Sequence, residues 1–165
     1  MKVNNVRRVA IIGGNRIPFA RSNTAYSEAS NQDMLTAALN GLVERYNLQG
    51  ERIGEVVAGA VIKHSRDFNL TRECVLSTAL APETTCYDIQ QACGTGLEAA
   101  ILVANKIALG QIESGIAGGS DTTSDAPIGV SEGLRSILLE MNRAKTNADR
   151  PASPTTPSAW PTAAR

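Results

Sequence analysis

Residues 88–100 read DIQQACGTGLEAA, and this stretch decides the fold class. Its first residues fit a buried strand, the glycines around Cys93 fit a sharp turn, and the apolar residues that follow fit a long helix. A cysteine at such a turn lies at the N-terminus of the helix, where unpaired backbone N–H groups and the helix dipole favour a thiolate. The stretch therefore predicts a strand–turn–helix unit that presents Cys93 as a nucleophile.

Strand and helix patterns alternate on both sides of this unit. Strands are predicted at residues 9–12, 54–62, 84–91 and 114–119, and helices at residues 31–46, 69–80, 94–109 and 132–146. Ser30 and Asp33 resemble a capping box at the start of the first helix. This βαβαβαβ order predicts an α/β fold, with a mostly parallel sheet and helices on both faces.

The helix predicted at residues 94–109 is unusual because it has almost no polar face. A helix that is apolar all round is expected to be buried on all sides. One three-layer domain cannot easily cover it. The sequence therefore implies a second layer, supplied by another domain or subunit.

Composition limits the possible partners and compartments. The 165 residues carry no net charge and 4% aromatic residues, which argues against nucleic acid or an anionic membrane as the main partner. The N-terminal apolar run at residues 9–12 is too short for a signal or a transmembrane segment. Three cysteines without a CxxC pair favour neither a disulfide framework nor a metal site, and we expect a reducing, cytoplasmic location.

The other candidate residues favour structural interpretations. Cys74 and Cys86 fall inside a predicted helix and a predicted strand, so we expect core residues. His64, the single histidine, follows a predicted strand, and we expect a solvated or hydrogen-bonded loop histidine rather than a base for Cys93. Gly118 and Gly119 with Asp121 fit a tight turn better than a phosphate-binding nest.

A dinucleotide site is a rival interpretation of the deciding stretch. Residues 94–99 fit G-x-G-x-x-A after a strand and at the start of a helix. The fingerprint expects an acidic residue at the end of the next strand, for the ribose. Glu113 precedes that predicted strand and Asp121 follows it too late, so this interpretation is the weaker one.

Several segments, in order, resemble the thiolases, the acyl-CoA C-acyltransferases. The segments are RIPFA at residues 16–20, NLTRE at 69–73, CGTGLEA at 93–99 and GGSDTTSDAP at 118–127. The segment QQACGTG, at residues 90–96, is most similar to the branch of the family that includes the thiolase subunit of fatty-acid β-oxidation complexes. The resemblance runs from about residue 9 to about residue 150.

The resemblance implies an organisation in three parts. Residues 1–130 correspond to a truncated N-terminal core domain, and residues 131–150 correspond to the start of a loop domain, with an amphipathic helix. Residues 151–165, PASPTTPSAWPTAAR, resemble nothing in the family, and their proline content predicts disorder. The expected fold is thus the N-terminal half of a thiolase fold, incomplete because its fifth strand and second half are not represented.

The resemblance also implies a function. It is acyl transfer between coenzyme A thioesters through a covalent acyl-cysteine, as in acetyl-CoA acetyltransferases and the 3-ketoacyl-CoA thiolases of fatty-acid β-oxidation. Cys93 would be the nucleophile, with its backbone N–H in an oxyanion hole. Acyl-CoA and acetyl-CoA would be substrates and no cofactor is implied. An intact form would be a homodimer and a possible subunit of a β-oxidation complex.

The truncation implies a limit on that function. The family's activating histidine belongs to the second half, so we expect this chain to be inactive alone. The alternatives are a non-catalytic interaction module that pairs with a full-length thiolase, or a pseudogene product.

Overall fold

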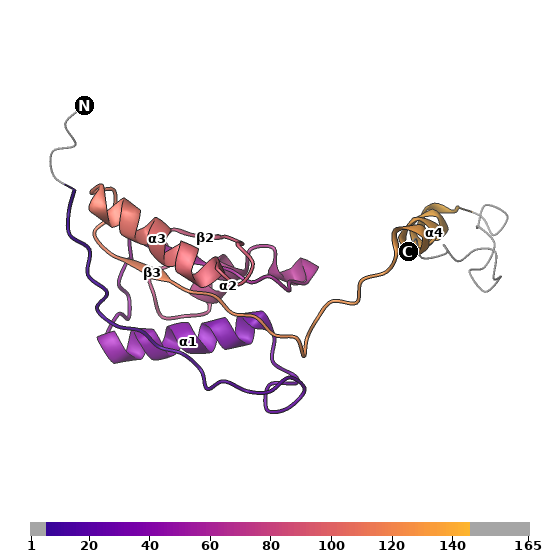
Figure 1. Ribbon diagram of the computed structural model, residues 1–165, viewed down its shortest axis with the longest axis horizontal. Helices are drawn as coiled ribbons and strands as arrows, with labels where there is room; N and C mark the ends of the chain where they lie inside the picture. The colour runs from indigo at the N-terminus through magenta and orange to yellow at the C-terminus, as the bar shows by residue number, and fades with distance from the viewer. Residues whose placement is uncertain (1–5, 146–165) are drawn as a thin grey trace. The chain divides into compact units, whose positions relative to one another are not determined.

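The computed structural model describes residues 6–145 and is built around a small parallel sheet. Its strands are β1 (Glu55–Ala58), β2 (Cys86–Asp88) and β3 (Gly115–Ala117), in the order β2-β1-β3. Val56 of β1 pairs with Cys86 on one side and with Ile116 on the other. The helices are α1 (Asn31–Tyr46), α2 (Leu70–Leu76), α3 (Thr95–Ala108) and α4 (Glu132–Arg143), with one 3-10 turn, η1 (Ser65–Asp67) (Figure 1).

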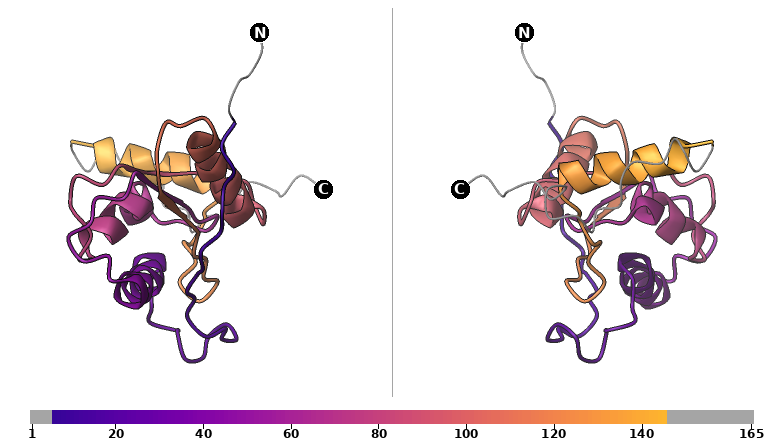
Figure 2. Two further views of the ribbon diagram at one scale, coloured as in Figure 1. Left: turned by 90° about the vertical axis from the view of Figure 1, so that its left-hand side faces the viewer. Right: turned by 90° about the vertical axis from the view of Figure 1, so that its right-hand side faces the viewer.

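The central strand β1 is buried along its whole length, because helices cover both faces of the sheet. Val56 and Ala58 point toward α1 and α2, whereas Val57 points toward α3. Figure 2 shows α1 and α3 on opposite sides of the strands. The expected α/β architecture, with a parallel sheet between helical layers, is confirmed.

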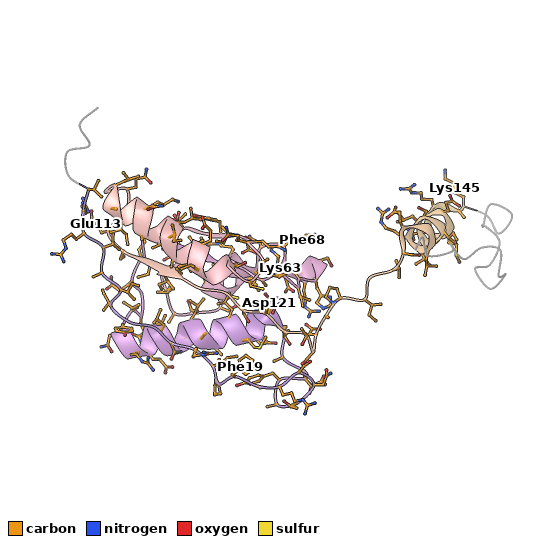
Figure 3. All side chains as sticks on the ribbon, viewed as in Figure 1. Phe19, Lys63, Phe68, Glu113, Asp121 and Lys145 are labelled. Atoms are coloured by element: carbon orange, nitrogen blue, oxygen red, sulfur yellow. The ribbon has the colours of Figure 1, made fainter. Side chains whose placement is uncertain are left out.

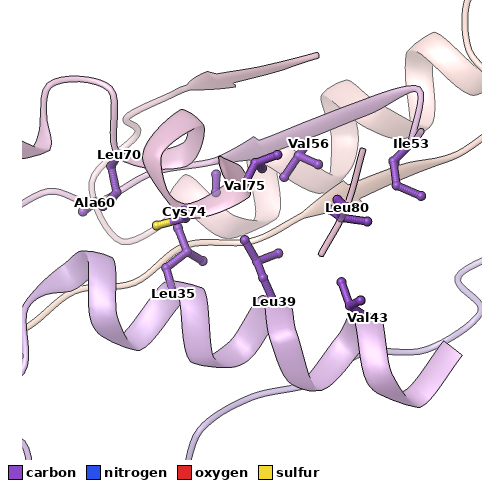
Figure 4. Close-up of a cluster of buried hydrophobic side chains, with 11 residues drawn as sticks. Leu35, Leu39, Val43, Ile53, Val56, Ala60, Leu70, Cys74, Val75 and Leu80 are labelled. Atoms are coloured by element: carbon purple, nitrogen blue, oxygen red, sulfur yellow. The ribbon is translucent and has the colours of Figure 1, made fainter. Parts of the chain in front are cut away.

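The larger of two hydrophobic clusters joins α1 and α2 to the sheet (Figure 4). It contains Leu35, Leu39, Val43, Ile53, Val56, Ala58, Ala60, Leu70, Cys74, Val75 and Leu80. The spacing of its α1 members by four residues gives the helix one apolar stripe. The capping box predicted for this helix is confirmed, since Ser30 and Asp33 each bond to the other's backbone N–H at 2.9–3.1 Å.

One predicted strand is wrong, because residues 9–12 form no strand. They are exposed, with Ile11 at 93% and Ile12 at 87%, and pair with no strand of the described sheet. The hydrogen bonds that hold this segment lie near its two ends. The Arg7 backbone N–H donates to Ala108 at 2.9 Å, and the Asn15 side chain donates to Ala38 at 2.9 Å. Without a neighbouring backbone to bond, an apolar run cannot become a strand.

Helix α3 is buried on one face only, which corrects the expectation of burial on all sides. Ala99 and Val103 pack against the sheet in the second hydrophobic cluster. On the other face Leu97 is 70% exposed and Ile101 is 44% exposed. Nothing in the described residues covers that face, so the implied second layer is not part of this chain's described structure.

The chain divides into two compact units, residues 1–127 and residues 128–165. The first, described from residue 6, holds the sheet with α1 to α3. In the second, described to residue 145, α4 begins at Glu132 and is capped by Ser131, whose side chain accepts from the Leu134 N–H at 3.4 Å. The tail predicted at residues 151–165 lies outside the described residues. Across residues 6–145, no helix combines the length and the apolar character needed to cross a membrane.

Candidate functional site

Cys93 lies on the turn between β2 and α3, as the sequence predicts. The strand ends at Asp88 and the helix begins at Thr95, with Gly94 as its N-cap residue. The Cys93 side chain is exposed and unpaired with another cysteine. The preceding residue, Ala92, has a φ of 45°, which is a left-handed conformation that non-glycine residues adopt only at a cost. The turn is therefore sharply bent immediately before the thiol.

The loops that follow all three strands meet around Cys93. They form an open depression of about 430 Å³, whose lining includes Gly59 after β1, Cys93 after β2, and Gly119, Ser120 and Asp121 after β3. Parallel strands deliver their carboxyl ends to one edge of a sheet, which explains this meeting. Figure 3 labels Asp121 at this edge. The nucleophile candidate thus has a space beside it in which a substrate group could lie.

Two glycines allow these loops to approach closely. A β-carbon on Gly59 would overlap the backbone oxygen of Ile89, and a β-carbon on Gly119 would lie 2.8 Å from the Gly59 oxygen. The loops are also bonded to each other, since the Ser120 N–H donates to Gly59 at 3.0 Å and the Ile89 N–H donates to Ala58 at 2.9 Å. Backbone contact between neighbouring loops therefore fixes the floor of the depression.

Asp121 joins the loop after β3 to the loop after β1. Its two carboxylate oxygens accept from the backbone N–H groups of Val61 and Ile62 at 2.9 and 2.8 Å. A carboxylate held in this way braces the loops and repels an anion, which argues against a phosphate nest. The tight turn predicted here is wrong, because residues 118–122 form no turn: the Gly118 and Ser120 N–H groups donate to Val57 and Gly59 instead.

Replacing Asp121 by asparagine should lower the free energy of unfolding by about 1–3 kcal/mol, because one of the two N–H groups would face an amide donor. Urea denaturation measures the change. Glu113→Gln is the matched control, since this exposed carboxylate pairs with Arg7 at the surface and should change stability little. Equal stability of both variants would contradict the bracing role.

His64 is a hydrogen-bonded loop histidine, as expected. Its Nε2 lies 2.9 Å from the backbone oxygen of Asp125 and 3.3 Å from a carboxylate oxygen of the same residue. Arg66 also pairs with Asp125. His64 does not line the depression beside Cys93, and the chain contains no other histidine.

Cys74 and Cys86 also behave as the sequence predicts. Cys74 is buried in α2, where burial raises the pKa of its thiol to about 11. Cys86 lies half-buried in β2, with the Arg72 guanidinium 3.7 Å from its sulfur. Both pack in or against the larger hydrophobic cluster.

The raised pKa of Cys74 predicts a loss of stability in alkali. An unfolded chain exposes a thiol with an ordinary pKa near 9.0, so it ionises first as the pH rises. The contribution of Cys74 is therefore full below pH 9 and falls away between pH 9 and about pH 11. Urea unfolding of the chain and of Cys74→Ala at pH 7.5 and 10 should show a smaller decline for the variant. Parallel declines would contradict the prediction.

The carboxylates that the dinucleotide interpretation needs are already engaged. Arg7 bonds both oxygens of Glu113 at 2.6 Å, and Asp121 is held by two N–H groups. Both side chains thus have structural partners of their own, which further weakens the dinucleotide interpretation. In the described part of the chain, no group of three histidine, cysteine or acidic side chains could hold a metal ion.

The structural roles of three residues of this site were not predicted from the sequence, in which Asp121 is a candidate only for a turn, a phosphate nest or a ribose contact. Thr95 bonds to the turn from within α3, Gly59 supports it from β1, and Asp121 braces the adjacent loop. The available signal was positional. Each follows a strand at the same sheet edge as Cys93, where side chains of parallel strands gather.

Comparison with known proteins gives consistent results. The family described as "Thiolase, N-terminal domain" matches residues 9–152. The 3-ketoacyl-CoA thiolase of Photorhabdus laumondii is 40% identical to this chain over 143 residues, which cover 87% of this chain and 33% of that protein. The 3-ketoacyl-CoA thiolase of Shewanella frigidimarina is also 40% identical, over 147 residues, which cover 88% of this chain and 34% of that protein. The crystal structure of the Bacillus anthracis acetyl-CoA acetyltransferase matches with a TM-score of 0.72 at 26% identity, and the match covers 78% of this chain and 32% of that one. The chain spans about a third of the length of these relatives.

Proposed function

The chain belongs to the thiolase family, and on that premise we propose that Cys93 accepts an acyl group from a coenzyme A thioester. The family match covers residues 9–152, so it includes the whole turn that carries Cys93. The observation that supports the proposal is the exposed thiol on a sharply bent turn at the N-terminus of α3, beside an open depression. Access to the thiol and a nearby helix N-terminus are both features that favour a nucleophilic cysteine.

The proposed step is a thioester exchange. The Cys93 thiolate attacks the carbonyl carbon of the acyl-CoA, a carbon–sulfur bond forms, and a tetrahedral oxyanion results. The Cys93 backbone N–H is the proposed donor to that oxyanion. Collapse of the intermediate breaks the bond to coenzyme A, whose thiolate leaves and takes up a proton. No electron is gained or lost overall.

The finer assignments rest on the relatives. Proteins named 3-ketoacyl-CoA thiolase support a role in fatty-acid β-oxidation, in which the longer acyl-CoA is shortened by an acetyl unit. We propose that role, a cytoplasmic location, and the homodimer and oxidation-complex association implied by the resemblance.

Intact mass spectrometry tests the acylation step. The chain is incubated with acetyl-CoA, and peptides are then mapped. We expect one acetyl group, on the peptide that contains Cys93. An unmodified Cys93 peptide after prolonged incubation would refute the proposal.

We expect the chain to stop at the acyl-enzyme. Its single histidine bonds to Asp125 and does not line the depression, so no imidazole is placed there to move a proton. General acid–base help is typically worth about 10²–10⁴-fold. Thiolysis of acetoacetyl-CoA by the purified chain should therefore be undetectable. Steady turnover that requires Cys93 would contradict this expectation.

A second candidate function is a non-catalytic module that pairs with an intact thiolase. The exposed apolar face of α3, with Leu97 and Ile101, favours it, because exposed apolar patches mark interaction surfaces. Mixing the chain with purified Shewanella 3-ketoacyl-CoA thiolase, followed by size-exclusion chromatography with light scattering, tests it. A complex lost in Ile101→Glu would support pairing, and elution of the two proteins apart would exclude it.

A further inference from the structure

We propose that Thr95 is the positioning residue that holds the Cys93 turn in its reactive shape. This inference rests on the proposed role of Cys93 as the acyl acceptor. It concerns the side-chain hydroxyl of Thr95, which bonds to the backbone of the turn.

The Thr95 hydroxyl forms two hydrogen bonds to the backbone of the turn, at Gln91 and at Ala92. It accepts a hydrogen bond from the Gln91 backbone N–H at 2.9 Å and donates one to the Ala92 backbone oxygen at 2.8 Å. Both the donor and the acceptor capacity that a hydroxyl uses here are thereby satisfied within residues 91–95. Because the side chain is buried, with 5% of it exposed, water does not readily replace these bonds.

These bonds enclose the strained residue of the turn. Ala92 has a φ of 45°, and its neighbours are Gln91, whose N–H is held, and Cys93. A non-glycine residue stays in this conformation only where its surroundings impose it. The surroundings here are the two bonds to the hydroxyl, with the Gly94 N–H donating to Gln91 at 2.9 Å and the Thr95 N–H donating to Ala92 at 3.2 Å.

Thr95 itself is fixed by the sheet. A β-carbon on Gly59 would lie 3.1 Å from the Thr95 methyl group, so this methyl group packs against the loop after β1. The methyl group of Thr95 therefore contacts the loop after β1, while its hydroxyl is bonded to the Cys93 turn. Through it, the rigid sheet sets the direction of the Cys93 side chain and backbone N–H. Without the hydroxyl, Ala92 can relax to negative φ and Cys93 turns with it.

Two substitutions separate the hydroxyl from the shape of the side chain. Thr95→Val keeps the branched shape and removes the hydroxyl, whereas Thr95→Ser keeps the hydroxyl. The readout is the rate of Cys93 alkylation by iodoacetamide from pH 6 to 9, followed by peptide mass spectrometry, with Cys86 in the same chain as the reference. We expect Thr95→Val to slow Cys93 about tenfold relative to Cys86, a loss of the order of one hydrogen bond, and Thr95→Ser to stay within about twofold. Circular dichroism shows whether each variant is folded.

Folded Thr95→Val that alkylates Cys93 at the original rate would overturn the inference, as would Thr95→Ser that is as slow as Thr95→Val. Hydrogen exchange of the unaltered chain gives a test that needs no variant. The Gln91 amide lies in an exposed turn, yet it should exchange at least tenfold more slowly than an unstructured amide because Thr95 accepts from it. Unprotected exchange at Gln91 would refute the inference even where Thr95→Val does not fold.

The proposed acylation of Cys93 and the role of Thr95 can be refuted separately. A chain that is not acylated by acetyl-CoA, but shows the alkylation difference and the protected Gln91 amide, would refute the proposed function alone. A chain that is acylated at Cys93, with Thr95→Val acylated equally fast, would refute the role of Thr95 alone.

Discussion

Cys93→Ala should abolish the acyl adduct that acetyl-CoA forms on this chain. The two remaining cysteines are poor substitutes. Burial in α2 raises the pKa of Cys74 to about 11, so it is almost wholly protonated at neutral pH, and the thiolate is the nucleophile. Cys86 is half-buried in a strand of the sheet. Intact mass spectrometry at pH 7.5 should show one acetyl group on the original chain and none on the variant.

Cys86→Ala is the matched control, because it removes a cysteine without touching the turn. It should keep the full adduct at Cys93. Persistence of the adduct in Cys93→Ala, or its disappearance in folded Cys86→Ala, would place the acyl group elsewhere and contradict the proposed site.

Local patterns predicted the elements near Cys93 well. The strand–turn–helix unit depends on residues adjacent in sequence, so DIQQACGTGLEAA was sufficient to place Cys93 immediately before α3. The sequence predicts the first helix with its boundaries at residues 31 and 46, because the capping box at Ser30 marks its start and the apolar stripe runs along it. Turn and cap chemistry of this kind acts over a few residues, which makes it readable from sequence.

Contacts distant in sequence account for what was missed. Residues 9–12 have the composition of a strand, but a strand also needs a partner backbone, and no local pattern reveals whether one is present. Likewise, Asp121 bonds to Val61 and Ile62 some sixty residues earlier, so its bracing role follows from the order of the strands. The exposed face of α3 is a third case, since the apolar pattern predicted burial without identifying what would cover it.

Gly59 shows how such distant contacts shape the site. It follows β1 directly, and its missing side chain lets the backbone oxygen of Ile89 approach where a β-carbon would stand. Ile89 opens the turn that carries Cys93, and its N–H bonds to Ala58 at 2.9 Å. The obstacle to a larger residue is backbone of the adjacent loop, which cannot rotate aside as a flexible side chain can. Close contact of this kind is a reason for glycine at a sheet edge.

Gly59→Ala should therefore cause the largest loss of stability of any single methyl group added to the site. Separating β1 from the turn after β2 should lower the free energy of unfolding by about 3 kcal/mol or more, which is a shift in Tm of roughly 10 °C for a chain of this size. Gly96→Ala is the matched control. Nothing lies within 4 Å of a β-carbon there, and alanine in the first turn of α3 should be neutral or stabilising by up to about 1 kcal/mol. Thermal unfolding of both variants tests this prediction. If Gly59→Ala has the same Tm as Gly96→Ala, the loops around Cys93 are not packed backbone to backbone.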